Sequence, residues 1–360
     1  MSVSYDNAPT HVVGFALTPE FSMVAFTSAL EPLRLANRVS GQELYAWRLY
    51  SANGEPVQAS NGVALSVDGT FADIGPMAEF YVCTGIDVQA GGHEKLIPKL
   101  RKLTLYGGAI GALCTGTYVL AKAGLLDGMR CSIHWENFES FREQFPDIDV
   151  TQDLYVIDAN RYTCAGGTAA IDMMLALIAR RHRSEIANLV VDELIYHRIR
   201  DAHEHQRMGL RARLGISHPK LIAVISEMEK QLEEPLSCVE LARHAGLSAR
   251  QLERLFQKYI GERPTRYYLQ LRLTRARYLL LQTSMPILSI GLACGFVSAS
   301  HFSKCYSEYF GRTPSDERKT MRRSIDAQTG RSVRPPAGSA LAHPSGVDGK
   351  KAKVPASPSK

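Results

Sequence analysis

The stretch SARQLERLFQKYIGERP, residues 248–264, returns fifty residues later as SASHFSKCYSEYFGRTP, residues 298–314. In both copies a serine is followed by apolar residues at every fourth position, and then by a glycine and a proline. Serine is a good helix N-cap, and glycine followed by proline is typical of a helix end. Each copy therefore predicts one capped, amphipathic helix. The apolar stripe is Leu252, Phe256 and Ile260 in the first copy and Phe302, Tyr306 and Phe310 in the second.

A short apolar helix precedes each copy. SCVELARHA, residues 237–245, runs into Gly246, and PILSIGLAC, residues 286–294, runs into Gly295. Two helices joined by a tight turn of this kind form a helix-turn-helix unit. We expect two such units, connected by a helix over residues 264–283.

The second helix of each unit leaves polar side chains on the face opposite its apolar stripe. Arginine can bond guanine with two hydrogen bonds, and glutamate can accept one from cytosine, whereas small and basic side chains suit methyl groups and phosphates. An ordinary solvated face of a helical bundle is the alternative. The predicted DNA-contacting residues are Arg250, Glu253 and Arg254 in the first unit and Ser298, Ala299, Ser300, His301 and Lys304 in the second.

The charge distribution supports the DNA-binding interpretation. Residues 1–210 carry 17 Lys and Arg against 24 Asp and Glu, whereas residues 211–324 carry 19 against 10. An acidic front half joined to a basic back half indicates that the back half meets a polyanion.

The front half alternates predicted strands and helices, which is typical of a mainly parallel sheet covered on both faces. GALCTGTYVLAKAGLL, residues 111–126, places Cys114 at a strand-to-helix elbow, a position where several enzyme families hold a nucleophile. The predicted strands include residues 11–17, 45–52, 79–86 and a hairpin over 153–167, and the predicted helices are 23–39, 93–103, 115–123, 136–145, 168–182 and 184–205.

Composition sets further limits. Seven scattered cysteines without a CxxC pair predict a reducing cytoplasm and no zinc site. The chain shows neither a long apolar run nor a secretory leader pattern, so we expect no membrane association. The predicted division is an arm (1–10), a sensor and dimerisation domain (11–205), a linker (206–220), a DNA-binding domain (221–324) and a disordered tail (325–360).

Residues 221–320 resemble the AraC/XylS-type DNA-binding domain. The motifs that carry the resemblance are LARHAGLSARQLERLF, LRLTRARYLL and ACGFVSASHFSKCYSEYFGRTP. The resemblance implies that both second helices enter successive segments of the major groove. Gly291 departs from the alanine common in the family, and a glycine there should soften the first helix of the second unit.

Residues 11–183 resemble the DJ-1/PfpI branch of the glutamine amidotransferase-like fold, through GALCTGTYVLAKAGLLDG, CSIHW and CAGGTAAIDMMLALI. The resemblance implies an α/β domain with a doubly wound, flavodoxin-like parallel sheet. The combination of the two domains resembles AraC-type regulators of glycine betaine, carnitine and arginine catabolism.

The resemblance also bears on catalysis. Peptidase-like relatives place a histidine after the cysteine, where this chain has Thr115, and DJ-1-like relatives place an acid where this chain has Met23. His134 is then the remaining candidate base, and no catalytic residue is predicted. We expect instead a small-molecule pocket built from Cys114, Thr115, His134 and Trp135, with helix amides for a carboxylate and the indole for a cationic amine.

The sequence thus predicts a cytoplasmic, homodimeric transcription activator that binds promoter DNA, works with RNA polymerase and senses a small nitrogenous metabolite, with no cofactor and no metal. Two alternatives stay open. One is a cysteine-dependent hydrolase or deglycase fused to a DNA-binding domain, and the other is a constitutive DNA-binding protein whose front half is a scaffold.

Overall fold

The computed structural model describes residues 9–85 and 92–319. Most of the predicted N-terminal arm and all of the predicted disordered tail lie outside these ranges. Within the described ranges, no helix combines the length and apolar character needed to cross a bilayer.

A seven-stranded sheet forms the centre of the front domain, in the order β10-β11-β7-β6-β1-β2-β5. Neighbouring strands run parallel except at the edge, where β10 pairs antiparallel with β11 as the predicted hairpin. The chain winds in opposite directions on the two sides of β1, which makes the sheet doubly wound, as predicted. Its strands are β1 (His11–Leu17), β2 (Tyr45–Ser51), β5 (Gly69–Thr70), β6 (Glu79–Cys83), β7 (Ala109–Leu113), β10 (Tyr155–Asp158) and β11 (Arg161–Cys164). Two small ribbons add β3 (Val57–Gln58) with β4 (Ala64–Leu65), and β8 (Arg130–Ser132) with β9 (Asp149–Thr151).

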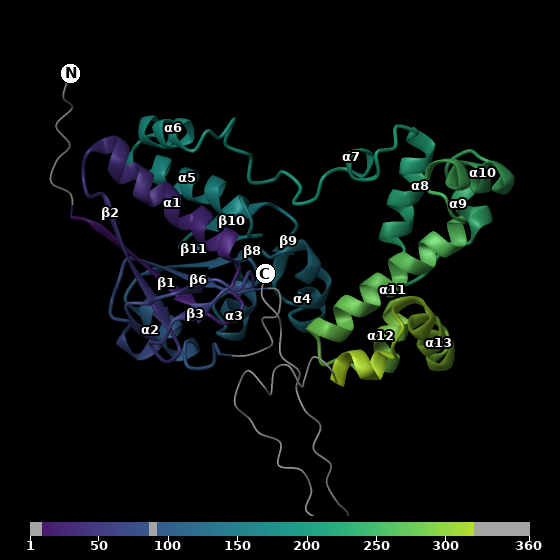
Figure 1. Cartoon of the computed structure of the whole chain (residues 1–360), viewed down its shortest axis with the longest axis horizontal. Helices are drawn as coiled ribbons and strands as arrows, with labels where there is room; N and C mark the ends of the chain where they lie inside the picture. The colour runs from purple at the N-terminus through teal and green to yellow at the C-terminus, as the bar shows by residue number, and fades with distance from the viewer. Residues whose placement is uncertain (1–8, 86–91, 320–360) are drawn as a thin grey trace, which may run out of the picture.

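Helices cover both faces of this sheet (Figure 1). One face carries α1 (Met23–Ser40), α5 (Ala169–His182) and α6 (Ser184–Glu193). The other carries α2 (Ile97–Leu105), α3 (Gly116–Lys122) and α4 (Phe138–Gln144). The central strands are buried on both sides, which explains why β7 is apolar throughout and β6 is apolar after Glu79, rather than alternating.

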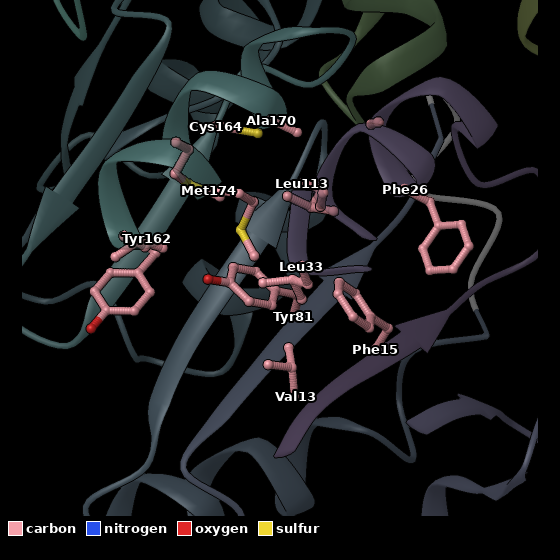
Figure 2. Packing of buried hydrophobic residues seen from close by; sticks show 14 of the residues in the cluster. Val13, Phe15, Phe26, Leu33, Tyr81, Leu113, Tyr162, Cys164, Ala170 and Met174 are labelled. Atoms are coloured by element: carbon pink, nitrogen blue, oxygen red, sulfur yellow. The ribbon is translucent and has the colours of Figure 1, made fainter. Parts of the chain in front are cut away.

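The core between the sheet and the first helical layer is aromatic and tightly packed (Figure 2). The rings of Phe15 on β1 and Tyr81 on β6 stack with their centroids 5.5 Å apart, and Phe26 of α1 meets Phe15 edge-on. Met174 of α5 and Leu33 of α1 are buried in the same cluster. Burial of this apolar surface is the main force that holds the layers together.

Three predicted helices of the front half differ from the observed ones. The predicted helix 93–103 is α2, which begins at Ile97, close to Pro98, because proline suits a first helical turn where the amide needs no partner. The predicted helix 136–145 is a 3₁₀ turn, Trp135–Asn137, followed by α4.

The predicted helix 184–205 is the largest difference, because α6 ends at Glu193. Ile195 has a φ of 53°, which turns the chain back toward α5. There the amide of Arg200 donates a hydrogen bond of 2.7 Å to the carboxylate of Asp172, whose side chain is fully buried. The buried carboxylate of Asp172 needs hydrogen-bond donors, and Arg200 supplies them from a non-helical segment. This requirement outweighs the helical periodicity of the sequence.

The back half is helical, and α11 spans it (Figure 1). The segment predicted as a linker, 206–220, contains α7 and the start of α8, and Leu210, Leu214 and Ile216 of this segment pack on the first helix-turn-helix unit. The helices are α7 (Leu210–Leu214), α8 (Pro219–Lys230), α9 (Cys238–His244), α10 (Ala249–Tyr259), α11 (Pro264–Gln282), α12 (Ile287–Ala293) and α13 (Ala299–Phe310).

Candidate effector pocket and DNA-binding surface

Cys114 occupies a strained elbow between β7 and α3. Its φ is 61°, in the left-handed region that non-glycine residues rarely adopt, and this is the geometry of a nucleophile elbow. The side chain is nevertheless buried, with 4% of the residue exposed. Burial, with a smaller effect from Cys164, raises the pKa of the Cys114 thiol to about 12. The thiol is therefore protonated at neutral pH and a poor nucleophile.

Thr115 is fully buried and its hydroxyl is engaged inside the protein. Its Oγ1 shares a hydrogen bond of 2.6 Å with Thr84 Oγ1 and also donates to the carbonyl of Gly85. The next residue, Gly116, lies so close to β6 that a Cβ there would come within 2.2 Å of the carbonyl oxygen of Val82. The start of α3 is thus packed against the strand ends.

A cavity of about 200 Å³ opens close to the elbow. Cys114 lies directly behind one wall of it, because a Cβ on Gly166 would fall 2.8 Å from the Cβ of Cys114. Two of the four predicted pocket residues, His134 and Trp135, line the cavity; Cys114 and Thr115 are not among the lining residues. The lining residues are His134, Trp135, Leu154, Ala165, Gly166, Gly167, Thr168, Ala169, Arg200 and Gln206.

The polar part of the cavity wall comes from the start of α5 and from the segment after α6. Thr168 is the N-cap of α5. Arg200 donates from Nη2 to Thr168 Oγ1 at 2.9 Å and to Asp172 Oδ2 at 2.7 Å, so its guanidinium is held in place. Gln206 donates from Nε2 to the carbonyls of Ile133 and Asp153, both at 2.9 Å.

Sequence reasoning missed Arg200, Gln206 and the start of α5 as pocket residues. The Gly-Gly-Thr sequence at 166–168, directly before a helix, is a local signal that could have pointed to α5. Arg200 and Gln206 carry no local signal, because both lie in the segment that was predicted to be helical or linker.

His134 and Trp135 form the other part of the wall. Burial lowers the pKa of His134, and the opposing influence of Glu136 is smaller, so the ring is neutral at neutral pH. The ring of Trp135 has the guanidinium of Arg207 4.4 Å above it, and Tyr278 of α11 meets it edge-on with a centroid distance of 6.3 Å.

The predicted DNA-contacting residues lie on the exposed faces of α10 and α13. On α10, Leu252 and Phe256 are fully buried, whereas the predicted contacts of this helix face solvent. Ser248 caps α10 and forms a capping box with Gln251. The exposed residues of this unit are Arg250, Glu253 and Arg254.

The second unit repeats this arrangement with Phe302 and Tyr306 as the buried residues of α13. Its cap, Ser298, accepts from the amide of His301 at 3.2 Å, so this hydroxyl is used within the helix. Lys304 lies 4.0 Å from Glu308 in an exposed i,i+4 pair, which contributes little to stability. The exposed residues of this unit are Ser298, Ala299, Ser300, His301 and Lys304.

Three arginines of α11 make contacts within the protein. Arg272 donates to the carbonyls of Cys294 and Gly295 and lies 4.3 Å from the ring centroid of Phe296. Arg275 and Arg277 pair with carboxylates. Their partners are Glu139 of α4 and the buried Glu317.

Among residues 9–85 and 92–319, no group of three His, Cys, Asp or Glu side chains is arranged to hold a metal ion.

Comparison with known proteins places these two parts in context. A model of the DJ-1/PfpI family matches residues 13–180, and a helix-turn-helix domain model matches residues 241–320. The chain is similar to the HTH-type transcriptional regulator GbdR of Pseudomonas aeruginosa, with 46% identity over 85% of this chain and 84% of that protein. It is also similar to the HTH-type transcriptional regulator CdhR of Pseudomonas aeruginosa, with 44% identity over 88% of this chain and 94% of that protein.

Among solved structures, an AraC family transcriptional regulator from Pseudomonas putida covers 51% of this chain and 99% of its own length, with 28% identity and a TM-score of 0.47. The two helix-turn-helix units and the front domain, together with these relatives, define a DNA-binding transcription regulator with a DJ-1/PfpI-type domain. The chain belongs to the family of HTH-type transcriptional regulators that join this domain to an AraC-type DNA-binding domain.

Proposed function

We propose that this regulator binds a small nitrogenous metabolite of the betaine, carnitine or arginine class in the cavity lined by Trp135 and the start of α5. Occupancy then determines how the two helix-turn-helix units engage promoter DNA, and the outcome is activation of amine or amino-acid catabolic genes. The single observation that carries this proposal is a cavity whose wall contains an aromatic ring, the start of α5 and an arginine bonded to that helix start.

The chemistry of the wall suits a zwitterion. A carboxylate is stabilised by the positive end of a helix and by a guanidinium, which Thr168 and Arg200 supply. A quaternary ammonium is attracted to the face of an indole, which Trp135 supplies. In this proposal α5 takes the role that the sequence assigned to α3, because the start of α3 at Thr115 is buried.

We propose that the front domain is not an enzyme. A thiol with a pKa of about 12 is protonated, and the Nδ1 atom of His134 accepts a hydrogen bond from the amide of Glu136 at 3.4 Å. Cys114 then serves as packing behind Gly166.

The assembly we propose is a cytoplasmic homodimer, since a double-stranded operator with two related half-sites matches a two-fold symmetric protein. Its front domain, 11–205, would carry sensing and dimerisation, and 221–324 would bind promoter DNA beside RNA polymerase. Because a ligand shifts an equilibrium only by its differential affinity, the effector must bind more tightly to the DNA-competent arrangement.

A thermal-shift panel tests the effector class. Glycine betaine, carnitine, choline, arginine and lysine are each added to the full chain, and one of them should raise Tm by about 5–10 °C at a hundredfold excess over its Kd. Trp135→Leu should abolish that shift. A flat response to all five would overturn the effector class and favour the scaffold alternative.

Cys114→Ala separates the sensor from the enzyme. The variant should keep effector-dependent activation of a reporter within about twofold, because the thiol lies behind the cavity wall. If the wild type turns over a glyoxal or amide substrate and the variant loses both turnover and activation, the enzyme alternative is correct.

A further inference from the structure

The segment Trp135–Gln144 lies between the cavity and the DNA-binding domain. On one side, Trp135 lines the cavity. On the other, this segment contacts α11 (Figure 1). Ser140 donates to Gln282 Oε1 at 2.7 Å, and Gln144 donates to the Gln282 carbonyl at 3.0 Å.

Two further residues of α11 continue this interface toward the cavity. Tyr278 donates to Glu136 Oε1 at 3.4 Å and meets the ring of Trp135 edge-on. Arg275 pairs with Glu139 at 3.3 Å. A shift of the Trp135 ring would therefore directly change its contact with Tyr278 of α11.

The linker residue Arg207 also contacts Trp135. Its guanidinium carbon lies 4.4 Å from the ring centroid. Within the described ranges, no carboxylate lies within 4 Å of Arg207 to form an ion pair. The preceding residue, Gln206, is fixed to the cavity wall, and the following residues lead into α7 and the DNA-binding domain.

We propose that Arg207 acts as an internal cation that occupies the aromatic face of Trp135 and is displaced when a cationic effector enters the cavity. This inference rests on the proposed function, because it assumes a ligand with a positively charged nitrogen. Without effector, Arg207 holds the linker against the front domain. Its release frees the linker between Gln206 and α7 and lets α11 change its position relative to the front domain.

The proposed physical basis is competition between two cations for the ring of Trp135, which contacts Arg207 and also lines the cavity. An exposed cation–π contact is weak, and Arg207 is an exposed residue, so a ligand that also gains contacts to Arg200 can displace it. Because effector binding must break the contact of Arg207 with Trp135, the free energy of that contact reduces the favourable free energy of effector binding by the same amount. Removing Arg207 should therefore tighten effector binding.

The test uses the full chain with glycine betaine as the probe. Arg207→Gln should lower the Kd for betaine by about twofold to fivefold, the range that corresponds to an exposed cation–π contact. Amide hydrogen exchange over residues 206–216 should be faster in this variant without betaine. In the wild type, betaine should produce the same acceleration.

Two variants serve as controls. Arg207→Lys keeps a cation and should restore the affinity and exchange of the wild type. Arg142→Gln removes a longer arginine–aromatic contact on α4, where the guanidinium lies 5.9 Å from the ring of Phe138, and should change neither measurement.

The outcomes separate the two proposals. If betaine binds the wild type but Arg207→Gln neither tightens binding nor speeds exchange, the role of Arg207 is wrong and the effector proposal stands. If no compound of the panel binds, the effector proposal fails. In that case unchanged exchange in Arg207→Gln overturns the role of Arg207 in holding the linker, and faster exchange supports that role.

Discussion

The two helix-turn-helix units have the same local design and different surroundings. Both have a serine-capped second helix with two fully buried residues, and both turns contain a glycine with positive φ, Gly246 and Gly295. The first unit packs on α8 and the N-terminal part of α11. The second packs on the C-terminal part of α11, the part that also contacts α4 of the front domain. In the proposed mechanism, a change at the cavity would therefore reach the second unit through fewer contacts.

The two helix-turn-helix units also differ locally in two ways. The second turn is one residue longer between its glycine and its serine cap, and the additional residue, Val297, is 92% exposed. The first helix of the second unit has Gly291 where the first unit has Ala242, as the matching hydrogen bonds from Phe296 and Leu247 show.

Gly291 is not simply a weak point in its helix. It is buried, and a Cβ there would lie 3.3 Å from Cδ1 of Phe302, closer than most such contacts. The glycine lets α12 approach α13 closely, so the expected softening of α12 is offset by packing.

The largest expected effect tests whether the two helix-turn-helix units unfold independently of each other. Phe256→Ala and Phe302→Ala each remove a fully buried ring and should each cost about 3–5 kcal/mol. Hydrogen exchange should show the loss of protection mainly in 221–260 for the first variant and in 287–310 for the second. Tyr259→Ala, at a 40% exposed position, is the control. Equal loss of protection in both units for either variant would mean that they unfold as one.

A smaller effect distinguishes the two DNA surfaces. Arg254→Ala should weaken binding to a selected operator by about 1–3 kcal/mol and have less effect on unrelated duplex, as expected for a base contact. Lys304→Ala should weaken binding to both duplexes alike and lower the salt slope by about 1. Titrations at fixed salt measure both, with the front-domain variant Arg38→Ala as control. Unchanged operator binding by Arg254→Ala would overturn the assignment of α10 as the helix that contacts the bases.

The smallest effect concerns the two first helices. Ala242→Gly should destabilise the first unit by about 1–2 kcal/mol, through lost helix propensity and a lost buried methyl. Gly291→Ala should change the second unit by less than about 1 kcal/mol, because better propensity is opposed by the contact with Phe302. Denaturant or exchange measurements on each unit compare the two. A gain at Gly291 as large as the loss at Ala242 would show that Phe302 does not limit this position.

Prediction from the sequence succeeded where the signal is local. Serine caps, glycine stops and four-residue apolar spacing are set by residues within a few positions of each other, so both units and the elbow at Cys114 were predictable. The strand His11–Leu17 was predicted with its observed bounds, because a buried parallel strand is a continuous apolar run. Prediction failed at Ser184–His205, where the buried carboxylate of Asp172 draws Arg200 out of the helical pattern.

By itself, the sequence determined the class of fold, the duplicated DNA-binding unit and its exposed faces, because each depends on periodicity and caps within short segments. Only the tertiary structure decided where the cavity lies and which side chains line it. Arg200, Gln206 and the start of α5 meet His134 and Trp135 through contacts between residues far apart in the chain. The same is true of the contact between Arg207 and Trp135 and of the interface with Gln282. Such contacts depend on how the layers pack, and no short stretch of sequence encodes them.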